Sequence, residues 1–354
     1  MIENAVLLTC GLFNHPNAKT AHGLIRVSQK YNIIGVIDNV YSGQDAGELL
    51  DGEYRNIPVF PSVVDTVEKF GGGIKYAIVG IALPGGIISE VLKKEIIECI
   101  KSGMSIVSGL HDYLSEIPEL KSLAKYYDVS LIDVRKPKPK DELTFWSGDI
   151  FEVTCPIIGV LGTDCALGKR TTTSLIVNAL HEKDVKAEMI YTGQTGYLQG
   201  YKYGFILDTT VNDFVSGELE KAILSCYRDC NPEIIFIEGQ SALCNPSGPC
   251  GAEYLLSARA KGVVLQHAPA REHYKGQDHT KQKISLKREI ALIRTYGSEV
   301  IVITLNTKGL TREEALDHKI NIEKEFEIPV ELPIEDGVTG VIDRITDYTS
   351  NYNG

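Results

Sequence analysis

A glycine-rich stretch near the middle of the chain has the residues that phosphate binding requires. An apolar run over 156–161 leads into Gly162-Thr163-Asp164-Cys165-Ala166-Leu167-Gly168-Lys169, and a helical pattern follows. Glycines let several backbone N–H groups converge on one anion, the following helix adds the positive end of its dipole, and a lysine supplies a mobile cation. The stretch therefore predicts a phosphate-binding loop in which Gly162, Thr163, Asp164, Gly168 and Lys169 contact the ligand.

The loop departs from the usual P-loop pattern in two ways. Its spacing is Gly-x5-Gly-Lys, one residue longer than usual, and Arg170 stands where a Mg²⁺-binding Ser or Thr normally lies. We therefore expect Arg170 and Thr171 to contact phosphate without a resident metal ion. One alternative is an ATP-dependent kinase or ligase that holds Mg²⁺ near Thr171, Asp164 and Glu238. Another is a nucleotide-binding protein without catalysis, and the simplest is a turn whose lysine is merely solvated.

Polar residues follow four further apolar runs, 187–191, 234–237, 263–266 and 300–305, which the pattern predicts as strands. In parallel α/β sheets, ligands bind outside the carboxyl ends of the strands. We therefore expect these polar side chains to converge on the phosphate loop. They are Gln194, Thr195, Glu238, Gln240, His267, Arg271 and Asn306.

Three of the polar residues at this predicted site are candidates for proton transfer. Glu238 and His267 have the side chains of a general base, and Asp164 in the loop is a further catalytic candidate. Each also has a structural interpretation: Glu238 as an acid held by backbone N–H groups, and His267 as a hydrogen-bonded structural histidine. Asn306 is either a turn former or an amide that recognises a nucleotide base.

Two series of alternating strands and helices must position these residues. The first has strands at 5–10, 33–37, 76–80, 105–107 and 129–132, with helices at 20–30, 63–70 and 88–102. The second begins at Pro156 and ends with a strand at 330–332. Such alternation predicts an α/β protein with two parallel sheets. We expect a Rossmann-like domain over 1–135, a linker over 136–152 and a P-loop α/β domain over 153–354.

The first domain lacks the Gly-x-Gly-x-x-Gly turn of dinucleotide-binding proteins, since its opening strand ends in Thr9-Cys10-Gly11-Leu12. Asp38 and the segment 84–86 are possible ligand contacts, although each is more often a turn former. Lys19, at the start of the first helix, is a candidate for binding a substrate carboxylate.

Composition narrows the classes of partner. The chain of 354 residues has 47 acidic and 36 basic residues, a net charge of −11 and no basic cluster. This charge distribution argues against binding to nucleic acid or to an anionic membrane. The start, Met1-Ile2-Glu3-Asn4, has no basic residue before the first apolar run, and no apolar segment of 18 residues occurs, so we expect neither secretion nor a membrane span. The eight cysteines form no Cys-x2-Cys pair. We expect a cytoplasmic protein with reduced thiols, a small-molecule ligand and a homo-oligomeric state.

Four segments together resemble one family. They are Gly162–Thr172, Thr192–Gly196, Val211–Gly217 and Ile237–Ser241, and they are similar to the corresponding motifs of the DUF1611 family, which combines a Rossmann-like N-terminal domain with a P-loop C-terminal domain. The loop is also similar to that of dethiobiotin synthetases, although their next Thr is Arg170 here.

The resemblance implies an N-acetyltransferase, because DUF1611 members include enzymes that acetylate D-glutamate from acetyl-CoA. Acetyl-CoA would then be the co-substrate, and its phosphates would bind to the loop without Mg²⁺. The acidic amino acid would be held by Lys19, Gln194, Thr195, Gln240 and Arg271, since amide, hydroxyl and cationic groups pair with carboxylates. Glu238 or His267 would accept the proton of the amine.

Overall fold

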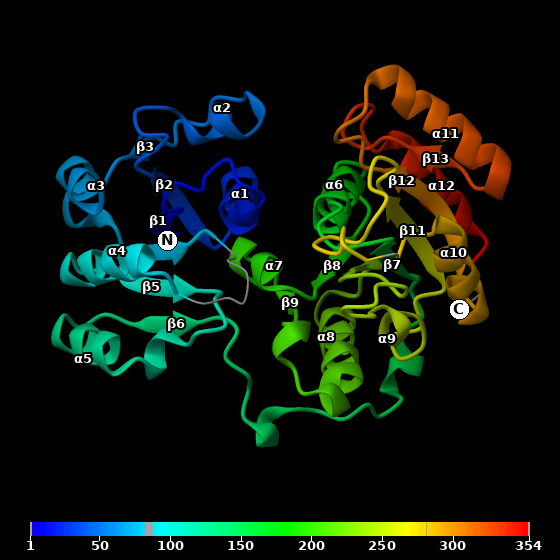
Figure 1. Ribbon diagram of the computed structural model, residues 1–354. Helices are drawn as coiled ribbons and strands as arrows, with labels where there is room; N and C mark the ends of the chain where they lie inside the picture. Colours follow the sequence, from blue (N-terminus) through cyan, green and yellow to red (C-terminus); the bar gives the residue numbers. More distant parts are fainter. Residues whose placement is uncertain (1, 82–87, 281, 353–354) are drawn as a thin grey trace. The chain divides into compact units, whose positions relative to one another are not determined.

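The computed structural model describes residues 2–81, 88–280 and 282–352, and the chain divides into two compact units (Figure 1). The first unit comprises Met1–Lys138 and Gln194–Tyr201, and the second comprises Pro139–Gly193 and Lys202–Gly354. The sequence pattern places one linker between two continuous domains. In the structure, by contrast, the chain leaves the second unit at Gln194 and re-enters it at Lys202.

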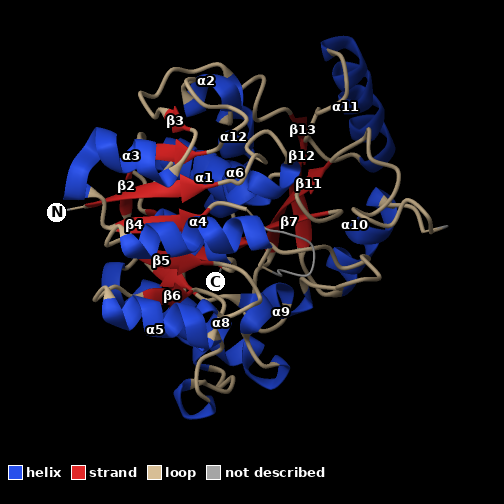
Figure 2. Cartoon of the chain, turned by 60° about the vertical axis from the view of Figure 1, so that its left-hand side comes forward, coloured by secondary structure: helices blue, strands red, loops and turns tan. Residues whose placement is uncertain are grey.

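The first unit is built on a parallel sheet of six strands in the order β3-β2-β1-β4-β5-β6. The strands are β1 (Glu3–Leu8), β2 (Tyr31–Ile37), β3 (Val59–Phe60), β4 (Tyr76–Val79), β5 (Ser105–Ser108) and β6 (Leu131–Asp133). The helices are α1 (Lys19–Arg26), α2 (Ala46–Asp51), α3 (Val63–Phe70), α4 (Glu90–Lys101), α5 (Pro118–Tyr126) and α7 (Gln194–Gln199). Helix α1 packs against α2 and α7 (Figure 1), whereas α4 packs against α3 and α5 (Figure 2).

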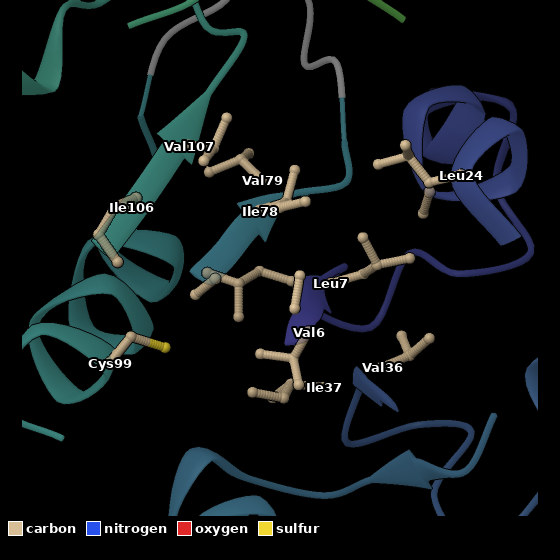
Figure 3. Close-up of a cluster of buried hydrophobic side chains, with 14 of the residues drawn as sticks. Val6, Leu7, Leu24, Val36, Ile37, Ile78, Val79, Cys99, Ile106 and Val107 are labelled. Carbon is tan, nitrogen blue, oxygen red and sulfur yellow. The ribbon is translucent and has the colours of Figure 1, made fainter. Parts of the chain in front are cut away.

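Apolar side chains of the central strands form the core of the first unit (Figure 3). Val6 and Leu7 of β1 are fully buried, and Leu24 of α1 and Cys99 of α4 pack in the same cluster. Strands covered on both faces need continuous apolar runs rather than alternation, which is why the sequence pattern identifies them. Leu198 of α7 also belongs to this core, which fixes the inserted helix to the first unit.

The second unit has a parallel sheet of seven strands in the order β13-β12-β11-β7-β10-β8-β9. The strands are β7 (Ile157–Gly162), β8 (Ala187–Tyr191), β9 (Tyr203–Gly204), β10 (Ile234–Glu238), β11 (Gly262–His267), β12 (Glu299–Leu305) and β13 (Val330–Glu331). The helices are α6 (Lys169–His181), α8 (Val215–Cys230), α9 (Ala252–Leu255), α10 (Leu286–Thr295), α11 (Arg312–Phe326) and α12 (Thr339–Ser350). All residues of β7 are buried, and β10 and β11 pair with it on either side.

Two carboxylates of α8 hold the segment before β7 against the rest of the second unit. Glu220 accepts hydrogen bonds from the backbone N–H groups of Ser147, Gly148 and Ile150, at 2.6, 2.9 and 3.0 Å. Glu218 accepts one from the N–H of Thr144 at 3.0 Å. These bonds satisfy backbone donors that would otherwise need water or a partner.

Two parallel-sheet α/β units confirm the predicted fold class. Strands β3 and β9 and helix α2 were not predicted, because these elements are too short to show a period. The carboxylate of Asp38 accepts hydrogen bonds from the Thr9 hydroxyl and the Phe13, Val40 and Tyr41 N–H groups. It therefore organises its own turn, and the predicted contact at 84–86 lies outside the described residues.

Candidate functional site

The predicted phosphate loop connects the end of β7 to the start of α6. Ala166 and Gly168 have positive φ angles of 52° and 103°, so the backbone turns sharply just before the helix. No side chain caps α6 at Gly168. At Gly162 a Cβ would lie 3.1 Å from the Gln266 carbonyl oxygen, so a larger residue would crowd strand β11. An uncapped helix start behind such a turn presents backbone N–H groups to an anion, which fits a phosphate group.

Lys169 is a buried cation inside this loop. Its side chain is 6% exposed, and its Nζ donates hydrogen bonds to the carbonyl oxygens of Asp164 at 2.6 Å and Ser241 at 2.8 Å. Burial lowers the pKa of the Lys169 ammonium because desolvation disfavours the charged form. Both hydrogen-bond partners are neutral carbonyl oxygens, so a bound phosphate would add a charge-assisted contact to this ammonium.

The Asp164 carboxylate joins the phosphate loop to two other loops. Its Oδ1 accepts from Asn245 Nδ2 at 3.1 Å. Its Oδ2 accepts from Arg271 Nη1 at 2.9 Å and from the Lys275 N–H at 2.8 Å. Arg271 Nη1 also donates to the Cys165 carbonyl at 2.7 Å. Asp164 and Arg271 are thus brought together as a partly buried ion pair, and both support the loop.

His267 lies at the end of β11 beside the loop. Its Nδ1 is 2.9 Å from the hydroxyl of Thr163, which is fully buried. Desolvation, with a smaller contribution from His318, lowers the pKa of His267 to about 4. The imidazole is therefore neutral near pH 7 and makes a structural contact with the loop.

Glu238 ends β10, next to the loop strand. Its side chain is 4% exposed, and its Oε2 accepts a hydrogen bond from the Thr192 N–H at 3.3 Å. The Thr192 hydroxyl donates to the Glu238 carbonyl and accepts from Gln240 Nε2 at 3.1 Å. The structure therefore brings Glu238 and Gln240 together with the end of β8, as the strand-end argument predicts.

Asn306 supports the loop from β12. Its Nδ2 donates to the Leu167 carbonyl at 2.8 Å, and its Oδ1 accepts from the Lys308 N–H at 3.0 Å. Arg170 and Thr171 lie half-buried in the first turn of α6. The amide of Asn306 therefore fixes the loop backbone, and its predicted contact with a nucleotide base stays a prediction.

Three predicted substrate ligands lie in the other unit. Lys19 is the first residue of α1, whereas Gln194 and Thr195 are buried in the first turn of α7. A Cβ on Gly109 would lie 1.7 Å from Gln194 Oε1, so Gly109 makes room for this side chain. Neighbouring positions in the sequence, Gly193 and Gln194, thus belong to different units.

The sequence analysis missed residues that complete the loop's surroundings. Gln266 Oε1 accepts hydrogen bonds from the hydroxyls of Thr172 at 2.6 Å and Thr304 at 2.9 Å, which links α6 to β12. Asn245, described above, was also missed. Polar residues inside apolar strands, such as Gln266 and Thr304, were the available signal, because buried polar groups need partners.

The described residues contain neither a metal-binding cluster nor a membrane-spanning helix. No group of three or more His, Cys, Asp and Glu side chains there is arranged to hold a metal ion. In the same part of the chain, every helix is too short or too polar to cross a bilayer.

The chain was compared with known protein families and proteins. Residues 144–342 match the P-loop domain of unknown function DUF1611_C, and residues 40–137 match the Rossmann-like domain DUF1611_N. A protein of Pseudoalteromonas named D-glutamate N-acetyltransferase is 29% identical over 276 residues, which are 76% of this chain and 81% of that protein. A protein of the same name from Tritonibacter scottomollicae is 28% identical over 284 residues, which are 78% of this chain and 83% of that protein.

A solved structure shows the same architecture. The crystal structure of a DUF1611 family protein from Anabaena variabilis is 28% identical, with a TM-score of 0.87, and the match covers 98% of this chain and 99% of that one. The similarity extends across both units. Together, the two domain matches and this structure show that the chain belongs to the DUF1611 family.

Proposed function

We propose that the protein is an N-acetyltransferase that moves an acetyl group from acetyl-CoA to the amino group of an acidic amino acid, D-glutamate. The observation that carries this proposal is the similarity to two proteins named D-glutamate N-acetyltransferase over about three quarters of the chain. It is a similarity of 28 to 29% identity, so the substrate has to be tested directly.

The phosphate loop suits the donor. Coenzyme A has a pyrophosphate and a 3′-phosphate, and the uncapped start of α6 together with buried Lys169 offers the donors and charge that one of these groups requires. Arg170 adds a second cation at the position of the usual metal ligand. We propose that this pair neutralises the bound phosphates without Mg²⁺.

The reaction forms a C–N bond and breaks the thioester C–S bond. The neutral amine attacks the carbonyl carbon, the thiolate of CoA leaves, and the proton lost by the amine passes to a base. Glu238 is our first candidate for that base, because its carboxylate lies at the carboxyl end of β10, next to the strand that leads into the phosphate loop. His267 is weaker in this role, because its low pKa makes it a poor proton acceptor.

Acceptor binding needs cations and amide donors for two carboxylates. Gln240 and Arg271 lie in the unit that contains the loop, and Lys19, Gln194 and Thr195 lie in the first unit. We propose Gln240 and Arg271 as acceptor ligands, and the expected roles of Lys19, Gln194 and Thr195 stay predictions. Arg271 would use the guanidinium nitrogens that do not bind Asp164.

The test mixes purified protein with D-glutamate and acetyl-CoA and follows release of free thiol, with and without EDTA. We expect thiol release in both samples and N-acetylglutamate by mass spectrometry, with L-glutamate as the matched control. A reaction that requires ATP and Mg²⁺ and yields ADP or phosphate would replace this proposal with a kinase or ligase. Absence of thiol release with either enantiomer would also contradict it.

A further inference from the structure

Ser241 has an unusual backbone conformation close to the phosphate loop. It follows β10 in the sequence Glu238-Gly239-Gln240-Ser241, and its φ angle is +36°. A positive φ angle of this kind is sterically unfavourable for any residue that has a Cβ atom. Strained residues of this kind persist where the surroundings hold them, and they cluster at binding and catalytic sites.

The hydroxyl of Ser241 is also unsatisfied. Its Oγ is buried, and it has no hydrogen-bond partner among the residues that the structure describes. A Cβ built on Gly248 would still lie 3.9 Å from this oxygen, so the neighbouring loop leaves the hydroxyl uncrowded on that side. A buried polar group without a partner requires an explanation, and a ligand that is not yet bound is one.

The position of Ser241 points to the ligand concerned. Its carbonyl oxygen accepts the hydrogen bond from Lys169 Nζ at 2.8 Å, so the residue adjoins the cation of the phosphate loop. The loop that begins at Ser241 is held at two further points, by Asn245 on Asp164 and by the Cys244 N–H on Glu289 at 2.8 Å. These contacts keep Ser241 in place despite its strained φ angle.

We propose that Ser241 is a ligand-binding residue whose hydroxyl donates a hydrogen bond to the same phosphate group that Lys169 binds. The inference rests on the proposed function for the identity of the ligand, a phosphorylated acyl donor. It adds a contact from the β10 loop to those of the phosphate loop. The site then holds one phosphate between a cation, the backbone N–H groups of α6 and a hydroxyl.

Two substitutions separate the hydroxyl from the backbone strain. Ser241→Ala removes the hydroxyl but keeps the strain of the positive φ angle. Ser241→Gly removes the hydroxyl and also relieves that strain, because glycine has no Cβ atom. We expect each to weaken binding of inorganic pyrophosphate and of CoA by about tenfold or more in calorimetry, because hydrogen bonds to charged groups are the strong ones. Ser241→Gly should in addition melt at or up to about 4 °C above the wild type.

Ser247→Ala is the matched control, because the hydroxyl of Ser247 lies in the same loop but donates to Asn245 Oδ1 at 2.9 Å. We expect it to bind pyrophosphate as the wild type does. Wild-type affinity in a folded Ser241→Ala protein would overturn the inference, as would failure of the wild type to bind pyrophosphate and CoA. If the Ser241 variants bind pyrophosphate more weakly but the wild-type protein transfers no acetyl group, only the proposed function is refuted.

Discussion

Lys169 combines two properties at the residue scale: it is almost fully buried, and its Nζ donates hydrogen bonds to two backbone carbonyl oxygens. Burying an ammonium group costs free energy unless an anion pairs with it, so this side chain is suited to bind an anion. The same arrangement explains why its pKa is lowered in the absence of ligand.

Replacing Lys169 tests the phosphate loop. We expect Lys169→Ala and Lys169→Met to weaken CoA binding by roughly 10 to 100-fold, because a charge-assisted contact contributes about 1.5 to 3 kcal/mol. Lys169→Met keeps most of the apolar stem, which limits the cavity that alanine would leave. Calorimetry measures both. Lys183→Ala, an exposed lysine just after α6, is the control, and unchanged affinity in both Lys169 variants would rule out the loop as the phosphate site.

Glu238 can be tested with a substitution that keeps its contact. In Glu238→Gln an amide oxygen can still accept from the Thr192 N–H, but the basic carboxylate is lost. We expect the chemical step to slow by roughly 10² to 10⁴-fold if Glu238 is the base, with little change in CoA affinity. Single-turnover kinetics measure the step.

Glu233→Gln provides the control for Glu238, because Glu233 lies just before the same strand and likewise accepts from a backbone N–H, that of Lys186 at 2.9 Å. It should leave turnover intact. Near-normal turnover in Glu238→Gln, with a lowered melting temperature, would make Glu238 a structural acid.

The residue types at the strand ends were predictable, but their pairings were not. The sequence identifies Asp164, His267, Arg271 and Asn306 as polar residues near the loop. It does not show that Arg271 binds Asp164 across more than a hundred positions, nor that Asn306 holds the Leu167 carbonyl. Such contacts depend on how the loops 268–280 and 306–310 fold back onto the phosphate loop. The hydrophobic periodicity of the sequence does not encode the course of these loops.

At the scale of elements, one family motif has a structural role. Gly217 in the segment Val211–Gly217 faces the chain before β7, and a Cβ there would lie 1.9 Å from the Thr144 carbonyl oxygen. Phe214 of the same motif packs on Phe145 with ring centroids 4.3 Å apart. The motif therefore docks the segment 139–152 on α8.

We expect Gly217→Ala to lower the melting temperature, because the new methyl group collides with backbone that cannot swing aside. The expected cost is about 1 to 3 kcal/mol of unfolding free energy, as for overpacking in a core. Chemical denaturation measures it. Gly340→Ala in α12 is the control, since its Cβ would meet only the flexible carboxylate of Glu331. Equal stability of the two variants would contradict this account.

One strand and one helix were predicted to the residue. The ranges 187–191 and 63–70 coincide with β8 and α3, because their apolar periods are complete within the element. Helix α7 was not foreseen. The segment Gln194–Gln199 is too short to show a helical period, and its burial comes from packing within the first unit, which local sequence does not report.

At the scale of the whole molecule, the chain passes between the units at 138–139, at 193–194 and again at 201–202. The sequence pattern predicts a single passage. A parallel α/β pattern tells which segments are strands, but the sheet that a short helix covers is decided by its partners. This is why the two parallel sheets were predictable and the course of the chain between the units was not.

The inserted helix α7 has a consequence for how such a protein can be divided or recombined. Leu198 is fully buried in the core of the first unit, although it is encoded between two strands of the second. A gene segment that encodes residues 139–354 would therefore include the segment 194–201, which packs in the core of the first unit. A gene segment that encodes residues 1–138 would lack this part of its own core. The two domains therefore cannot be exchanged as independent parts divided at 138–139.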